Sequence, residues 1–200
     1  MPRASIDPAV QEPSVASKDF TVLIIPGLRD HVADHWQTRL AARLSNCRTV
    51  PPLQADKLSL AARVAAIQSE LERIEGPVVL VAHSAGVLMA VHWAALRSAP
   101  ILGALLATPP DLNSAWPPQY PSPQTLQDNG WSPLPRGPLP FPSIVAASSN
   151  DHLASLEAVR EMARDWGATL VELGAVGHLN PASGYGDWPQ AEELIQALLG

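Results

Sequence analysis

The chain has 200 residues and a single cysteine, Cys47, which suits one domain with a buried core and excludes an internal disulfide. Its formal net charge of −6 at pH 7 would repel a phosphate backbone, which argues against nucleic-acid binding. No apolar run reaches the roughly 18 residues of a membrane span, and the N-terminus lacks the apolar stretch of a signal peptide. We therefore expect a cytoplasmic protein that binds neither nucleic acids nor membranes.

The first 18 residues and the rest of the chain differ in pattern. Residues 1–18 lack periodicity and are rich in proline, serine and alanine, which predicts a flexible tail before a single domain at 19–200. From residue 20 onward, apolar runs alternate with amphipathic stretches that are typical of helices. The apolar runs predict strands at 20–25, 47–50, 78–82, 101–107, 143–147 and 168–173. The amphipathic stretches predict helices at about 36–44, 59–75, 85–97, 153–166 and 189–199.

The alternation of strands and helices predicts the fold class. Strands that are apolar on both faces belong in a parallel sheet covered by helices on both sides. We therefore expect a single-domain α/β fold whose mostly parallel sheet has about six strands and carries no large cap domain. In such sheets, binding and catalytic sites lie at the carboxyl ends of the strands.

The segment at 109–142 interrupts this alternation. It holds eleven of the 21 prolines and four aromatic residues, Trp116, Tyr120, Trp131 and Phe141. A segment of this length without periodicity is uncommon in a small domain unless it has a function. It is interpreted either as a lid or pocket wall, with Trp116 and Trp131 as candidate substrate contacts, or as a surface connection that covers the sheet edge.

The strand at 78–82 leads directly into His83-Ser84-Ala85-Gly86 and then into a helix. This order of strand, sharp turn and helix is the setting of a nucleophile elbow, in which the turn exposes a serine hydroxyl above the sheet. The motif here is A-x-S-x-G, with Ala82 in place of the first glycine of G-x-S-x-G. We predict that Ser84 is a nucleophile; the alternative is that it only caps the following helix.

A serine nucleophile needs N–H donors for the oxyanion that forms when it attacks a carbonyl. The N–H of Ala85 lies at the start of the predicted helix, where the helix dipole favours negative charge. The loop at 26–31 is expected to give the second donor, with Leu28 as the first choice and Arg29 as the other possibility. Arg29 and His83 adjoin these groups and are further candidates for substrate contact.

The serine also needs a base and a group that orients that base. Of the six histidines, His178 lies in a glycine-rich loop after the last predicted strand, where the base stands when the chain order is Ser, Asp, His. Asp151 follows the fifth strand and is the predicted orienter; the alternative is that it caps the helix near Leu153. His31 and His35 are four residues apart but have no further ligands nearby, so no metal site is predicted.

Several of these segments together resemble a known family. The matching pieces are IPG at 25–27, HWQ at 35–37, AHSAG at 82–86, SSND at 148–151 and GHLN…SGYGDWP at 177–189. They resemble the small serine hydrolases that include retinoblastoma-binding protein 9 and the bacterial YdeN-type proteins. The resemblance implies an α/β-hydrolase domain, the set Ser84, Asp151 and His178, and hydrolysis of esters or of N-terminal peptide bonds. Ala82 and His152 depart from the family pattern without removing a reacting atom.

The predicted activity is hydrolysis of a small carboxylic ester or amide through an acyl-enzyme, without a metal or organic cofactor. The expected partner is therefore a small-molecule substrate, and nothing in the sequence indicates a protein partner. The alternative is a non-catalytic module that uses a hydrolase-like pocket to bind a ligand or a protein. A third interpretation keeps the acyl-enzyme but transfers the acyl group to an alcohol instead of water.

Overall fold

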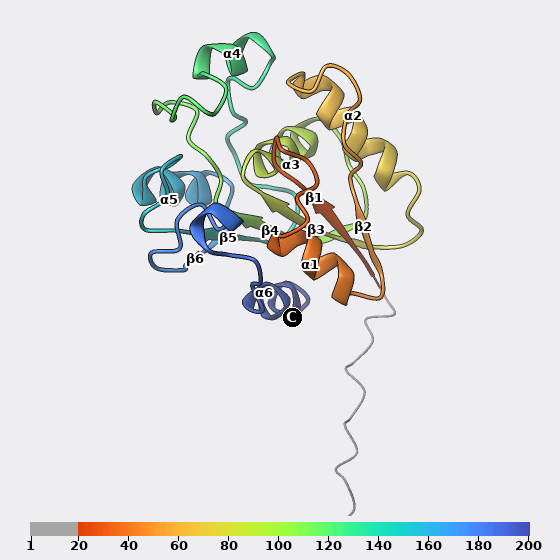
Figure 1. Ribbon diagram of the computed structural model, residues 1–200. Coiled ribbons are helices and arrows are strands. Elements are labelled where there is room, and N and C mark those ends of the chain that lie inside the picture. Colours follow the sequence, from red (N-terminus) through yellow and green to blue (C-terminus); the bar gives the residue numbers. More distant parts are fainter. Residues whose placement is uncertain (1–19) are drawn as a thin grey trace, which may run out of the picture.

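The protein is built on one parallel sheet of six strands, seen in a computed structural model that describes residues 20–200 (Figure 1). The tail predicted at 1–18 lies outside these residues. In chain order the strands are β1 (Thr21–Ile25), β2 (Cys47–Thr49), β3 (Val78–His83), β4 (Ile101–Ala107), β5 (Ser143–Ala147) and β6 (Thr169–Glu172). Their order across the sheet is β2-β1-β3-β4-β5-β6, and all neighbours are parallel. The predicted α/β fold with about six strands is therefore confirmed.

The strand order reverses between β1 and β3. The chain passes from β1 to β2 on one side, and then returns to place β3 on the other side of β1. At such a reversal, the loops that leave the two central strands turn away from each other and open a crevice at their carboxyl ends. The loop at 26–31 follows β1, and Ser84 follows β3, so both predicted parts of the oxyanion site border this crevice.

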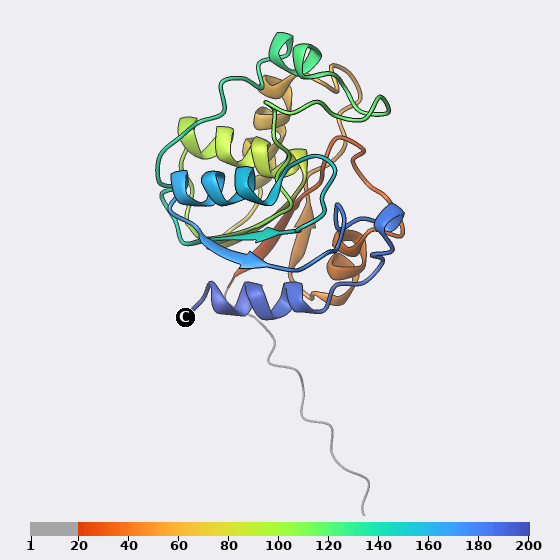
Figure 2. The same ribbon diagram turned by 90° about the vertical axis from the view of Figure 1, so that its left-hand side faces the viewer.

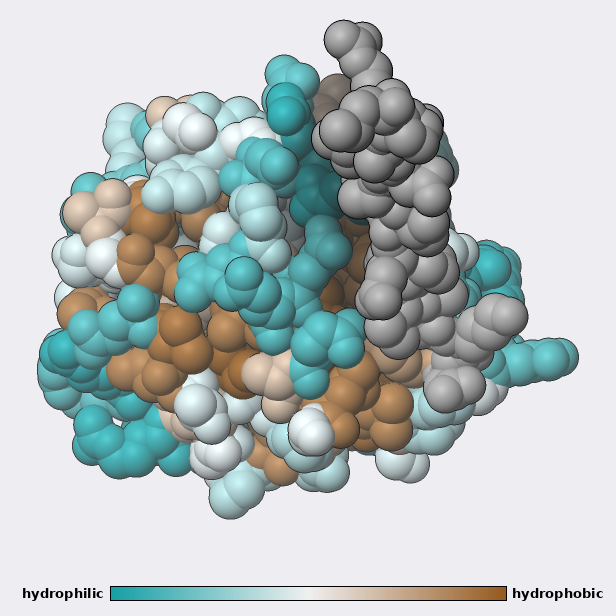
Figure 3. Space-filling view, turned by 90° about the horizontal axis from the view of Figure 1, so that it is seen from below, coloured by the Kyte–Doolittle hydropathy of each residue, from teal (hydrophilic) through white to brown (hydrophobic). Residues whose placement is uncertain are grey.

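Helices cover both faces of the sheet (Figure 2). One face is covered by α2 (Leu60–Leu71), α3 (Ala85–Leu96) and α5 (Leu156–Asp165). The other is covered by α1 (Trp36–Arg43) and α6 (Gln190–Ala197). Seen from the side of α1 and α6, hydrophobic side chains reach the surface between polar ones (Figure 3). In the described part of the chain, no helix has the length and apolar character to span a membrane; the two longest, α2 and α3, have 12 residues each.

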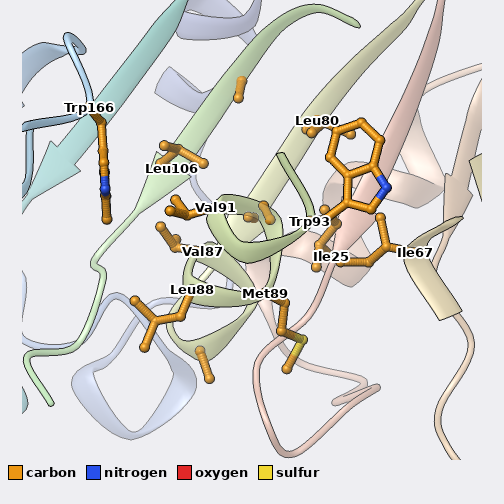
Figure 4. Packing of buried hydrophobic residues seen from close by; sticks show 14 of the residues in the cluster. Ile25, Ile67, Leu80, Val87, Leu88, Met89, Val91, Trp93, Leu106 and Trp166 are labelled. Carbon is orange, nitrogen blue, oxygen red and sulfur yellow. The ribbon is translucent and has the colours of Figure 1, made fainter. Parts of the chain in front are cut away.

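The helix α3 is surrounded by other elements and is apolar on every side. All of its residues from Ala85 to Trp93 are buried, as expected for a helix without a polar face. Trp93 packs near Ile25 and Ile67, while Leu106 lies close to Val91 on another side of the helix (Figure 4). The predicted nucleophile elbow thus stands at the start of the most deeply packed of the helices that the structure describes.

Element boundaries differ from the sequence predictions where side chains cap the helices. The helix predicted from about residue 153 begins at Leu156, because the hydroxyl of Ser155 accepts a hydrogen bond from the N–H of Ala158 at 3.2 Å. The helix α2 ends at Leu71 rather than near residue 75.

The proline-rich segment contains ordered structure that the sequence analysis did not predict. A short helix, α4 (Pro123–Asp128), begins after Ser122, whose hydroxyl accepts from the N–H of Thr125 at 3.1 Å. The buried indole of Trp131 donates to the carbonyl of Leu58 at 2.7 Å, which attaches the segment to the chain just before α2. Side-chain and backbone hydrogen bonds of this kind replace the missing sheet and helix ladders.

Candidate active site

Ser84 stands in the sharp turn between β3 and α3. Its φ of 57° and ψ of −130° are unusual for a residue with a side chain, and such strain is typical of a nucleophile elbow. The side chain of Ser84 caps no backbone N–H, so the alternative interpretation as a helix cap does not fit. The turn also requires the glycine two positions later, because a Cβ at Gly86 would lie 2.3 Å from the carbonyl oxygen of Ile25.

The structure brings His178 and Asp151 to Ser84, from loops that follow β6 and β5. The Nε2 atom of His178 lies 2.8 Å from the Ser84 hydroxyl, and its Nδ1 atom lies 2.8 Å from Oδ2 of Asp151. An ionised carboxylate can only accept a hydrogen bond, so Nδ1 carries the proton and Nε2 is left to accept from the serine. Both side chains are almost fully buried, at 3 % exposure for His178 and 2 % for Asp151.

The second oxygen of Asp151 fixes its own loop rather than a helix. Its Oδ1 atom accepts from the N–H of Leu153 at 2.9 Å, whereas the helix α5 starts later and is capped by Ser155. The interpretation of Asp151 as a helix cap is therefore wrong. With both oxygens engaged, the carboxylate cannot rotate away from His178 without losing a second hydrogen bond.

Hydrogen bonds tie the loop that carries His178 to the loop that carries Asp151. The Asn150 side-chain oxygen accepts from the N–H of Gly177 at 2.6 Å, and the Ser148 hydroxyl accepts from the N–H of Val176 at 3.3 Å. Further along the loop, the Ser183 hydroxyl accepts from the N–H of His178 at 3.1 Å. The polar residues after β5 thus hold the backbone just before His178 as well as its imidazole.

Two backbone N–H groups near the Ser84 hydroxyl donate no hydrogen bond within the described part of the chain. Across residues 20–200, no protein atom accepts a hydrogen bond from the backbone N–H of Leu28 or Ala85. The loop of Leu28 approaches Ser84 closely, because a Cβ on Gly27 would lie 3.3 Å from the Cβ of Ser84. Both residues line the pocket that holds the hydroxyl.

Two further histidines, His83 and His35, pack behind His178. The rings of His83 and His178 have centroids 5.0 Å apart, and those of His35 and His83 are 4.5 Å apart. The Nε2 atom of His83 lies 2.9 Å from the carbonyl oxygen of His178, so this nitrogen carries the proton and donates it. Burial lowers the pKa of His83 well below its usual value, with smaller contributions from His178 and His35.

His35 is also neutral at pH 7. Burial, and to a smaller extent the nearby His178, lowers its pKa to about 4. Its Nδ1 atom accepts a hydrogen bond from the N–H of Gln37 at 3.2 Å and so caps α1. A protonated ring would lose this bond, because both nitrogens would then be donors.

The pocket at Ser84 has a volume of about 190 Å³. This is smaller than the roughly 300–1,000 Å³ of pockets that hold drug-sized ligands, so it suits a small group. Its apolar walls come from the loop after β1, the proline-rich segment and the loops after β5 and β6. These walls are Leu28, Val32, Trp116, Tyr120, Pro121, Leu153, Pro181 and Ala182.

Comparisons with known proteins agree with this geometry. Residues 22–197 match the family model described as serine hydrolase. The chain belongs to the serine hydrolase family. No curated protein sequence matches it.

Solved structures of related hydrolases support the assignment. A YdeN-like hydrolase from Pectobacterium atrosepticum is 28 % identical, with a TM-score of 0.76 over 92 % of this chain and 95 % of that one. The ydeN gene product from B. subtilis is 18 % identical, with a TM-score of 0.70 over 90 % and 98 % of the two chains. An α/β-hydrolase fold protein from Burkholderia ambifaria, 13 % identical, gives 0.66 over 91 % and 90 %. The resemblance to YdeN-type serine hydrolases and the predicted α/β-hydrolase fold are thus confirmed.

The four predicted substrate contacts of this serine hydrolase fall in different places. Arg29, His83 and Trp116 line the pocket at Ser84. Trp131 does not, because its side chain is fully buried in the core beside α2 and α3. An aromatic residue in a proline-rich segment gives no sign in the sequence of whether it faces a pocket or the core, and of the two tryptophans only Trp116 lines the pocket.

Sequence analysis missed the role of Gln37. Its side-chain amide is buried and donates to the carbonyl of Val81 at 3.0 Å and to that of Ile25 at 3.3 Å. It therefore joins the carboxyl ends of β3 and β1, the two strands that carry Ser84 and the loop of Leu28. The signal was present, since Gln37 belongs to the HWQ segment, but the spacing alone did not indicate its partners.

Proposed function

We propose that this serine hydrolase cleaves a small carboxylic ester or amide through an acyl-enzyme. Ser84 is the nucleophile, His178 the general base and Asp151 the residue that orients the imidazole. The observation that carries the proposal is the chain of hydrogen bonds from the Ser84 hydroxyl to Nε2 of His178 and from Nδ1 to Asp151, each 2.8 Å long. A hydroxyl that lines a pocket next to a correctly protonated imidazole is what nucleophilic attack on a carbonyl requires.

In the first step, His178 takes the proton of Ser84 as the hydroxyl oxygen attacks the carbonyl carbon. Asp151 stabilises the positive imidazolium that results. The negative oxygen of the tetrahedral intermediate accepts hydrogen bonds from the N–H groups of Leu28 and Ala85. One such donor contributes on the order of 3 kcal/mol to transition-state stabilisation.

In the second step, His178 gives its proton to the leaving alcohol or amine, and the acyl group stays on Ser84. A water molecule then attacks the ester of the acyl-enzyme while His178 again removes a proton. The tetrahedral intermediate then collapses, the bond from the acyl carbon to the Ser84 oxygen breaks, and His178 returns its proton to that oxygen as the carboxylic acid leaves. His83 and His35 are both neutral at pH 7, so they do not oppose the positive charge on His178.

Replacement of Ser84 tests the proposal directly. We expect the purified protein to react with a fluorophosphonate probe and to hydrolyse members of a panel of p-nitrophenyl esters and aminoacyl amides. Ser84→Ala should abolish labelling and lower kcat by a factor of roughly 10³ or more, while the fold is retained. Ser98→Ala, an exposed serine beyond α3, is the matched control and should behave as the unmodified protein.

The two alternative functions, a binding module and an acyltransferase, give different results in the same experiment. A binding module would leave Ser84 unlabelled and the whole panel intact, which would contradict the proposal. An acyltransferase would be labelled, but its product in the presence of an alcohol would be a new ester rather than the free acid. Panel members that Ser84→Ala hydrolyses at the original rate would remove Ser84 from the mechanism.

A further inference from the structure

One charged side chain at the active-site pocket has no ion-pair partner. Two charged side chains border it, Arg29 and Asp30. Asp30 forms an ion pair with Arg63, and both members of that pair are largely buried. In the described part of the chain, Arg29 has no carboxylate within ion-pair distance. In this acidic protein, with a net charge of −6, Arg29 is therefore a cation at the pocket without an ion-pair partner, while the carboxylate of Asp151 is held by His178 and Leu153.

An aromatic ring from the proline-rich segment lies against Arg29 at the pocket. The guanidinium carbon of Arg29 is 5.7 Å from the centroid of the Tyr120 ring. The Tyr120 hydroxyl in turn lies 3.0 Å from Nε2 of His152, the residue next to Asp151. Stacking on a ring leaves the N–H donors at the edge of a guanidinium free, and these donors match the two oxygens of a carboxylate.

We propose that the substrate is an ester or amide that also carries a carboxylate, and that Arg29 binds this carboxylate. The inference rests on the proposed hydrolase function, because it concerns the same pocket. Arg29 lines the same pocket as Ser84, and a cation without an ion-pair partner attracts an anion there even though the net charge of the protein disfavours anions in general. The apolar walls formed by Leu28, Val32 and Leu153 fit a short hydrocarbon link between the carboxylate and the carbonyl that Ser84 attacks.

Two pairs of substrates, each differing by one charge, test the proposal. The first pair is mono-p-nitrophenyl adipate and its methyl ester, in which the charge lies on the acyl group. The second is para-acetoxybenzoate and its methyl ester, in which the charge lies on the leaving group. In at least one pair we expect kcat/KM to favour the acid by about tenfold after subtraction of the Ser84→Ala rate, as for one charge-assisted contact.

Variants of Arg29 assign this preference to one side chain. Arg29→Met removes the charge at similar length and should bring the ratio of the two kcat/KM values close to one, whereas Arg29→Lys should restore part of it. Arg97→Met, which removes an exposed arginine at the far end of α3, is the matched control and should leave the ratio unchanged. The preference should also weaken as salt is raised well above about 0.1 M, where the Debye length is about 10 Å.

Two results would overturn the proposal: no preference for the acid in either pair, or a preference that survives in Arg29→Met. If neither pair is turned over, the same comparison is made with adipate and adipamide as protectants of Ser84 against the fluorophosphonate, where adipate should protect better. Failure of the hydrolase function itself is separate, because it appears as an unlabelled Ser84.

Discussion

The nucleophile elbow and the proline-rich segment border the same pocket but are held in place in different ways. The elbow joins a central strand to the most buried helix, and at Gly86 the backbone of the neighbouring strand leaves no room for a Cβ. The segment at 109–142 is held by scattered side-chain contacts, such as the indole of Trp131 on Leu58 and the Tyr120 hydroxyl on His152. One region is fixed by close backbone packing, and the other by scattered side-chain contacts and single backbone hydrogen bonds, such as that from the N–H of Leu139 to the carbonyl of Trp166.

Under the proposed function, the elbow serves the reaction and the proline-rich segment serves the choice of substrate. Ser84 stands on backbone that has no room to move, so its position is insensitive to surface changes. The wall that contacts substrate depends on single side chains, so it can change shape when one of them changes. Substitutions in the two regions should therefore differ in both size and kind of effect.

The largest effect is expected from Gly86→Ala. A Cβ there would lie 2.3 Å from the carbonyl of Ile25 and 2.7 Å from that of Pro26, and backbone atoms cannot move aside as a flexible side chain can. We expect the free energy of unfolding to fall by about 5 kcal/mol, at the upper end of single substitutions. Urea denaturation followed by circular dichroism measures it. A loss below about 1 kcal/mol would contradict close backbone packing at the elbow.

Trp131→Ala should have the next largest effect, although it lies in the proline-rich segment. The side chain is fully buried and its N–H donates to Leu58, so its removal leaves a cavity and an unpaired carbonyl. The expected loss is about 4 kcal/mol of unfolding free energy. Trp116→Ala is the matched variant, because Trp116 is only half-buried and lines the pocket; it should change KM more than stability. Equal stability losses in the two variants would contradict this division of the segment.

The histidines behind the elbow predict a loss of stability in acid. The pKa of His35 is about 4 in the folded protein and about 6.5 when unfolded, so the unfolded chain binds more protons between these values. The contribution of His35 is present above about pH 6.5 and is lost as the pH falls toward 4. His35→Asn keeps a side-chain oxygen to cap α1 but cannot be protonated. Between about pH 7.5 and pH 5, the unfolding free energy of both proteins should fall. The fall should be about 2 kcal/mol smaller in His35→Asn than in the unmodified protein. Identical pH dependence in urea titrations would rule out a buried, neutral His35.

How far the site could be predicted depended on how local its signals are. Ser84 could be predicted from the sequence, because an apolar strand, a small residue and a glycine surround it within a few positions. His178 and Asp151 followed from chain order and from the resemblance, and the structure brings both within hydrogen-bonding distance of their partners. The strands were predicted closely, because buried parallel strands are continuous apolar runs.

The features that could not be predicted from the sequence depend on contacts between distant segments. Trp131 meets Leu58 across 73 positions, and Gln37 meets Val81 across 44. Neither partner is marked by any local pattern, so Trp131 was assigned to the wrong side of its segment and Gln37 was given no role. The helix α4 was missed because six residues flanked by prolines do not show a helical period.

The smallest effect is expected from Tyr120→Phe. This change removes the hydroxyl that contacts His152 but keeps the ring that lies against Arg29. Since the contact is exposed, we expect a loss of no more than about 1 kcal/mol in stability and a change in KM of less than about fivefold. Steady-state kinetics and thermal unfolding measure both. A loss of kcat as large as in Ser84→Ala would mean that the wall takes part in the chemistry after all.

The hydrogen bonds between the two loops after β5 and β6 have one more consequence. Because Asn150 and Ser148 hold the backbone of residues 176 and 177, a displacement of the loop that carries the imidazole pulls the carboxylate's loop with it. The base and its orienter are thus coupled mechanically as well as electrostatically. Thermal motion at this edge of the sheet would therefore change the distance between His178 and Ser84 more readily than the distance between His178 and Asp151.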